Sequence, residues 1–182
     1  MKTLLLIKIL LLLFLVSCSQ TPSISGEEKK LFDILEKIPF VEVLSPQYLM
    51  NFSAKVGGGK YLFKGQKVSM RVIKNFNKWV KDISLIENKI FMLEPSMAGF
   101  AAGMYDDSRV SIYLDADRWY NYDEKTKELV IYHELAHDYF NAEHSNKRCD
   151  IMNSSLNDGC YQDKLRNMDL HLLVLGKKYL KW

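Results

Sequence analysis

The stretch of sequence that decides the fold runs from residue 133 to residue 144 and reads HELAHDYFNAEH. It contains three of the 4 histidines in the chain. On an α-helix, His133 and His137 lie one turn apart on the same side, where both imidazoles can bind a single metal ion. Glu134 then projects close to that ion without having to bind it. A catalytic metal ion needs a third protein ligand while one position stays open for water, so His144 is the expected third ligand.

The residues before this stretch predict a helix that carries the histidine pair. Asn121 and Glu124 resemble a capping box at its beginning, and Asp123 is a second candidate for the N-cap. Glu134 should lie toward the polar side of this helix. The apolar residues fall on one arc, which the histidine pair borders; its members are Leu129, Tyr132, Ala136, Tyr139 and Phe140. A pair in that position lies where the floor of a cleft would form.

The identity of the third ligand depends on where this helix ends. Asn141 is predicted to end it, because asparagine tolerates the left-handed conformation better than most residues other than glycine. The chain can then return and bring His144 to the metal ion. Cys149 is an alternative ligand, whereas a glutamate is excluded because none follows Glu143. Aspartate ligands also remain open, and the candidates are Asp150, Asp158, Asp163 and Asp169.

Outside this helix, the sequence predicts a single α+β domain with a small mixed sheet. Ser45 and Pro46 indicate the beginning of a short helix that runs toward Ala54. Gly176 is expected just past the end of a C-terminal helix that carries His171, for which we expect no metal role. The other expected elements are a strand and then a helix within 68–83, a strand at 90–93, a loop or edge strand at 97–104, a strand at 110–114 and the C-terminal helix at 165–175. The sheet should pack on the histidine-bearing helix and on the C-terminal helix.

The first residues predict a targeting segment that is not part of the fold. Lys2 and Lys8 form a basic start, and residues 9–16 are an apolar run too short to span a bilayer. The sequence Leu-Val-Ser-Cys, which ends at Cys18, resembles a bacterial lipobox, in which the cysteine is acylated and becomes the new N-terminus. An ordinary secretory signal is the alternative. Two or three acyl chains would anchor the protein stably in a membrane.

This interpretation divides the chain into three parts: a signal peptide at 1–17, the acylated cysteine with a flexible tether at 18–26, and a folded domain at 27–182. The protein would be attached through Cys18 to a membrane of the bacterial cell envelope. The residue directly after the cysteine is Ser19 and not an aspartate. By resemblance to lipoprotein sorting in other envelopes, this favours the outer membrane.

The charge balance argues against nucleic-acid binding. The chain has 25 basic and 22 acidic residues, and the loss of Lys2 and Lys8 with the signal peptide leaves 23 basic residues against 22 acidic ones. A nearly neutral domain lacks the basic surface that nucleic-acid-binding proteins use. We expect a monomer.

Two cysteines remain once Cys18 is acylated. Cys149 and Cys160 bracket the loop around Met152, and an exported protein resides where disulfides persist. A disulfide between them would fix this loop. Two buried free thiols are the alternative.

The histidine motif is similar to that of the zincin metallopeptidases, and in particular to their metzincin-like branch. The matching pieces are HELAH at 133–137, His144 and Ile-Met-Asn at 151–153. Metzincins have a third histidine after a helix-ending glycine and a methionine-containing turn below the metal. The stretch at 110–152 also resembles a group of small bacterial lipoproteins regarded as metallopeptidases. These share a strand that ends in aspartate and a following tryptophan, here Trp119.

The chain departs from the metzincin pattern at three positions. Six residues separate His137 from His144, where metzincins have five, and Asn141 replaces the helix-ending glycine. Asp138 is also unusual, because zincins prefer an uncharged residue after the second histidine. The first two departures are compatible with each other if Asn141 takes the left-handed position one step later.

The resemblance implies a zincin-like domain that binds Zn²⁺ through His133, His137 and His144 and hydrolyses peptide bonds of a peptide or protein substrate. A water activated by zinc would attack the carbonyl, and Glu134 would be the general base. Met152 would form an apolar floor under the histidines. The alternative is a non-catalytic envelope lipoprotein that holds zinc structurally or binds a partner.

Overall fold

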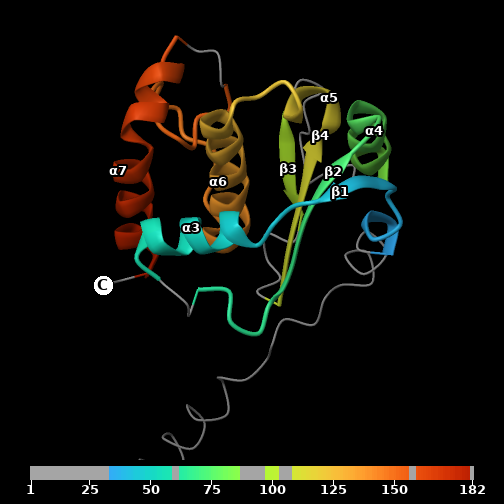
Figure 1. The fold of residues 1–182 in the computed structure, drawn as a ribbon, viewed down its shortest axis with the longest axis horizontal. Coiled ribbons are helices and arrows are strands. Elements are labelled where there is room, and N and C mark those ends of the chain that lie inside the picture. The colour runs from blue at the N-terminus through green and yellow to red at the C-terminus, as the bar shows by residue number, and fades with distance from the viewer. Residues whose placement is uncertain (1–32, 59–61, 87–96, 103–107, 156–158, 181–182) are drawn as a thin grey trace, which may run out of the picture. The chain divides into compact units, whose positions relative to one another are not determined.

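The computed structural model describes residues 33–58, 62–86, 97–102, 108–155 and 159–180 (Figure 1). The chain divides into two units, residues 1–36 and 37–182. In the first unit, the described residues start with a helical turn at 33–35. The expected signal peptide, the lipidated cysteine and the tether lie outside the described residues. Within the part of the chain that is described, no helix combines the length and the apolar character needed to cross a bilayer.

The second unit is built on a four-stranded mixed sheet. Its middle strands, β2 and β4, run parallel and in register, from Lys67 opposite Arg109 to Ile73 opposite Asp115. The outer strands β1 and β3 are antiparallel to their neighbours. In the order in which they lie in the sheet, the strands are β1 (Phe40–Val43), β2 (Lys67–Ile73), β4 (Arg109–Asp115) and β3 (Gly99–Ala102). The predicted α+β class and mixed sheet are therefore confirmed.

The middle of the sheet is apolar because helices cover both of its faces. In β4, every residue from Ile112 to Asp115 is buried. Parallel strands need a crossover connection, and helix α4 (Phe76–Ile86) lies in the connection from β2 to β4. This confirms the expected change from strand to helix within 68–83. In Figure 1, α4 lies on one side of the sheet and α6 (Glu124–Phe140) lies on the other.

Helix α6 is the central element of this unit. It contacts β3 and β4 on one side, and α3 (Gln47–Val56) and α7 (Tyr161–Leu180) on the other (Figure 1). The short helix α5 (Ala116–Trp119) connects to the end of β4. The expected C-terminal helix is thus present as α7, and it packs against α3 and α6. Because α6 has neighbours on both sides, ten of its residues are buried.

Two of three smaller predicted elements fall on described residues. The predicted short helix is present as α3, but its N-cap is Pro46 and not Ser45; the Ser45 hydroxyl accepts a hydrogen bond from the N–H of Gln47 at 3.2 Å. The segment expected to be a loop or an edge strand contains β3, which is an edge strand among the described strands. The strand expected at 90–93 lies outside the described residues.

The expected position of Gly176 after the C-terminal helix is wrong, because α7 continues to Leu180. Gly176 is buried inside the helix, opposite the last turn of α3. A Cβ atom at this position would overlap the carbonyl oxygen of Val56. The glycine therefore permits the close approach of α3 and α7.

Substitution Gly176→Ala is expected to lower the free energy of unfolding by about 1–3 kcal/mol. Alanine favours a helix over glycine by about 1 kcal/mol, but its methyl group would push the backbone of Val56 away. Urea denaturation measures the difference. Val174→Ala, at a position that is 56% exposed on the same helix, should change the midpoint little. An unchanged or higher midpoint for Gly176→Ala would contradict the close packing.

Candidate metal centre

Both ends of α6 are determined by single side chains. At its beginning, the Asp123 carboxylate accepts a hydrogen bond from the N–H of Thr126 at 2.7 Å, so the second of the two predicted caps is the one used. At its end, Asn141 is left-handed with φ 48° and ψ 37°, as predicted. The N–H of Ala142 then donates to the carbonyl of Ala136 at 3.3 Å, which closes the last turn. The chain reverses there and leads back toward the helix.

This reversal brings the three histidines of the motif together. The Nε2 atom of His133 lies 3.0 Å from Nε2 of His137 and 3.2 Å from Nε2 of His144. One ligand atom from each of the three residues lies within 4.8 Å of the other two. The group His133–His137–His144 could therefore hold a metal ion.

The hydrogen bonds of the rings show which nitrogen atoms are available to a metal. Nδ1 of His133 donates to the carbonyl of Ile151 at 2.7 Å, and Nδ1 of His137 donates to the carbonyl of Ala142 at 2.5 Å. In a neutral imidazole, a proton on Nδ1 leaves a lone pair on Nε2. The two Nε2 atoms thus present lone pairs to each other at 3.0 Å, with no proton between them.

A metal ion would remove this unfavourable contact. Two imidazole nitrogens on a tetrahedral zinc ion, each at about 2.0–2.1 Å, lie roughly 3.3 Å apart. The observed separations of 3.0 Å and 3.2 Å are close to that value. The donor set and its spacing therefore fit a metal ion.

The surroundings of the histidine pair favour the neutral rings that a metal requires. Burial, reinforced by the neighbouring His137, lowers the pKa of His133 to about 3. Burial and the neighbouring His144 lower the pKa of His137 to about 4. Both rings are neutral at pH 7, so a metal ion would not have to displace a proton from either.

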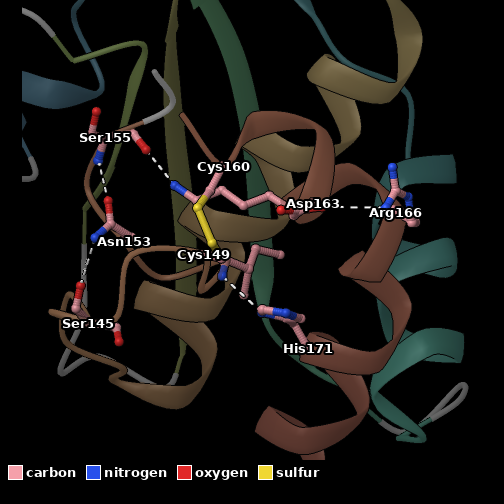
Figure 2. The surroundings of a disulfide bond; sticks show 10 residues. Ser145, Cys149, Asn153, Ser155, Cys160, Asp163, Arg166 and His171 are labelled. Carbon is pink, nitrogen blue, oxygen red and sulfur yellow. Dashed lines mark hydrogen bonds and ion pairs between the residues drawn. A yellow bond between two sulfur atoms is a disulfide. The ribbon is translucent and has the colours of Figure 1, made fainter. Parts of the chain in front are cut away.

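The alternative third ligands are elsewhere in the structure. Cys149 forms a disulfide with Cys160, so its sulfur is not available as a thiolate (Figure 2). Asp150 accepts a hydrogen bond from the N–H of Met152, Asp163 pairs with an arginine, and Asp169 pairs with a lysine. Asp158 lies outside the described residues. Of the described candidates, only His144 lies with the histidine pair.

Glu134 is buried, with 6% of its surface exposed, and not directed to the polar side of the helix as expected. The reason is that β3 covers this side of α6: a Cβ atom on Gly99 would lie 3.3 Å from Cγ of Glu134. The backbone N–H of Ala101 donates a hydrogen bond to the Glu134 carboxyl group. Burial nevertheless dominates and raises the pKa of Glu134 to about 8.

Asp138 occupies the same side of α6, one turn after Glu134. The residue is 5% exposed, and its carboxylate accepts a hydrogen bond from the N–H of Ser111, in β4, at 3.3 Å. The unusual acidic residue after the second histidine therefore ties the helix to the sheet. Two carboxyl groups one helical turn apart thus accept backbone hydrogen bonds from adjacent strands.

Met152 lies in a turn that supports the histidines through its backbone. Its side chain is buried, and its carbonyl accepts a hydrogen bond from the N–H of Ser145 at 2.8 Å, directly after His144. The preceding residue, Ile151, provides the carbonyl for His133. The turn thus binds Ser145, the residue after His144, and also binds the ring of His133.

Sequence reasoning missed the carbonyl groups of Ile151 and Ala142, which orient two of the rings. A backbone carbonyl has no side-chain signature, so only the path of the chain reveals this function.

A separate cavity of about 470 Å³ lies beyond the end of α6, lined by Asp138, Asn141 and Tyr179 among others, and by none of the three histidines. We do not assign this cavity to the metal centre.

Comparison with protein-family models, with curated proteins and with solved structures found no match to this chain.

Proposed function

We propose that this protein is a zinc-dependent metallopeptidase with His133, His137 and His144 as metal ligands and Glu134 as general base. One observation carries the proposal. Three imidazole groups converge, and two of them have their Nε2 lone pairs directed at each other. A buried glutamate follows the first of these histidines. Two histidines one helical turn apart, with a glutamate after the first, are the arrangement that zinc metallopeptidases with an HExxH helix use.

Zinc is the metal that this donor set favours. Imidazole nitrogen suits Zn²⁺, and three protein ligands with one open position are typical of catalytic zinc sites. A purely structural site would normally have a fourth protein ligand. Cys149 is the nearest candidate in the sequence for such a fourth ligand, but its sulfur is bonded to Cys160. The exposure of His144 is consistent with a site that substrate can reach.

Glu134 would transfer the proton in hydrolysis. Zinc bound to the three rings would polarise a substrate carbonyl and make a water molecule more acidic. The Glu134 carboxylate would accept a proton from the attacking water and deliver it to the leaving amine. Burial raises the pKa of this carboxyl group to about 8 in the metal-free protein, and the positive charge of a bound ion would favour the carboxylate form that accepts the proton.

Strand β3 is suited to hold a peptide substrate. It is at the edge among the described strands, and it contacts α6 next to Glu134. Extended peptides commonly bind by adding a strand to such an edge. Three of its four residues are small, namely Gly99, Ala101 and Ala102. We also propose the lipid anchor at Cys18, which would place this activity at the bacterial cell envelope.

A non-catalytic lipoprotein with a structural metal is the second candidate, and one observation favours it. The hydrogen bond from Ala101 to Glu134 resembles the bond from Ser111 to Asp138. Glu134 would then be an anchor between helix and sheet, with no proton to transfer. Substitutions that keep the anchor but remove the base distinguish the two candidates.

The direct test is the metal content of the purified protein together with its activity on an unfolded protein substrate. One zinc ion per chain and hydrolysis that a chelator abolishes and added zinc restores would support a metallopeptidase. Stoichiometric zinc without hydrolysis of any substrate in a broad peptide library would favour the structural candidate. A folded protein that binds no zinc would contradict both.

A further inference from the structure

The fourth histidine, His171, contacts the turn that supports the metal centre. It lies in the middle of α7, and its side chain is 24% exposed. The N–H of Ile151 donates a hydrogen bond to Nδ1 of His171 at 3.1 Å. Figure 2 shows His171 directed from α7 toward the loop that carries Cys149.

Ile151 uses both of its backbone groups in this arrangement. Its N–H donates a hydrogen bond to His171, and its carbonyl accepts one from Nδ1 of His133 at 2.7 Å. The residue is 2% exposed, so neither group could exchange its partner for water without cost. One residue therefore connects a histidine of α7 to a histidine of the metal centre.

The tautomer of His171 follows from this contact. Because Nδ1 accepts a hydrogen bond from a backbone amide, the neutral ring has its N–H at Nε2. The carboxylate oxygen Oδ1 of Asp150 lies 3.8 Å from Nδ1, which is beyond hydrogen-bonding distance. That oxygen accepts from the N–H of Met152 at 3.0 Å. Asp150 thus shapes the turn, whereas His171 holds it against α7.

We propose that His171 is a positioning residue for the metal ligand His133 and acts through the backbone of Ile151. The inference rests on the proposed metal centre but not on peptidase activity. His171 fixes the place of the Ile151 carbonyl, and the carbonyl fixes the tautomer and orientation of the His133 ring. The Cys149–Cys160 disulfide holds the same loop at the beginning of α7, so the segment is fixed at two points.

Groups that orient a metal-binding histidine typically change metal affinity by about 10–100-fold when they are removed. His171 acts one step further away, so the lower end of that range is expected. Removal of the imidazole acceptor would leave the buried N–H of Ile151 without its partner. The turn would then shift, and His133 would lose its defined orientation.

The test compares the substitutions His171→Leu and His171→Asn in the full-length protein. Leucine fills the space but accepts no hydrogen bond. The Oδ1 atom of asparagine takes nearly the place of Nδ1 and can accept from Ile151. Zinc affinity, measured by competition with a chromophoric chelator well below the unfolding temperature, should fall about 10-fold for leucine and stay within about threefold for asparagine.

A second readout needs no metal. The amide proton of Ile151 should exchange with solvent faster in metal-free His171→Leu than in the wild type, and asparagine should restore its protection. Leu170→Ala, at a neighbouring position that is 59% exposed, is the matched control and should change neither quantity.

The outcomes separate this inference from the proposed function. A wild-type protein that binds zinc but cleaves no peptide would overturn the peptidase and leave the positioning role supported by the two readouts. An unchanged zinc affinity in His171→Leu, even with a lower unfolding temperature, would show a merely stabilising residue and overturn the inference. A wild-type protein without zinc affinity would overturn both.

Discussion

Substitution Glu134→Gln should lower the rate of peptide hydrolysis by about 10²–10⁴-fold, the usual contribution of a general base, while one zinc ion stays bound. Glutamine keeps an oxygen that can accept the hydrogen bond from Ala101, so helix α6 should remain in place on β3. It cannot take a proton from water. Initial rates at saturating substrate, with zinc content from the same samples, measure the two effects separately.

Asp138→Asn is the matched control for this experiment. Asp138 is a buried carboxylate on the same helix, and it also accepts a backbone hydrogen bond from the sheet. Asparagine also keeps an oxygen that can accept this bond, so the replacement should leave the hydrolysis per folded, zinc-loaded molecule within about threefold of the wild type, since it removes no proton carrier. An equal loss of activity in both variants would indicate that the two carboxyl groups serve the packing of α6 alone.

Substitution His144→Ala should weaken zinc binding by at least about 100-fold, because loss of a direct ligand exceeds the typical loss of an orienting group. His144 is the exposed member of the three, so its removal should disturb the core little. Equilibrium dialysis against buffered zinc would measure the loss, and circular dichroism would show that the fold remains. Glu143→Ala, at the exposed preceding position, is the control and should bind zinc as the wild type does.

The sequence was most informative where a local interaction decides the structure. Asp123 begins α6 through a bond to a residue three positions later, and Asn141 ends it by its own backbone conformation. The alternation of Val110, Ile112 and Leu114 likewise predicted β4. In each case, the residues that determine the element are the residues of the element itself. Prediction from one segment at a time therefore succeeded.

The sequence was least informative where a segment distant along the chain determines the local structure. Glu134 was expected on the polar side of its helix, but β3, about 30 residues earlier in the chain, covers it. Gly176 was expected after a helix, but it lies inside α7 because α3 approaches there. The helical periodicity of the apolar residues predicts one buried face, whereas α6 is buried both against the sheet and against other helices.

The candidate metal centre combines both situations. The grouping of the three histidines follows from helical spacing and from the turn at Asn141, so sequence reasoning could anticipate it. The hydrogen bonds that set the tautomers of His133 and His137 come from main-chain carbonyls. They depend on the three-dimensional path of the loop after α6, which no residue type signals.

The short distance along the chain between the three histidines has a consequence for the order of assembly during folding. All of them come from residues 133–144, and loops of that length close within about 10–100 ns. The contact between β3 and α6 that surrounds Glu134 requires a longer and slower closure. Metal capture and completion of the catalytic surroundings are therefore separable events. A molecule in which β3 has detached from α6 could still bind the proposed metal ion through the three histidines, but it would lack the surroundings of Glu134 that the proposed hydrolysis needs.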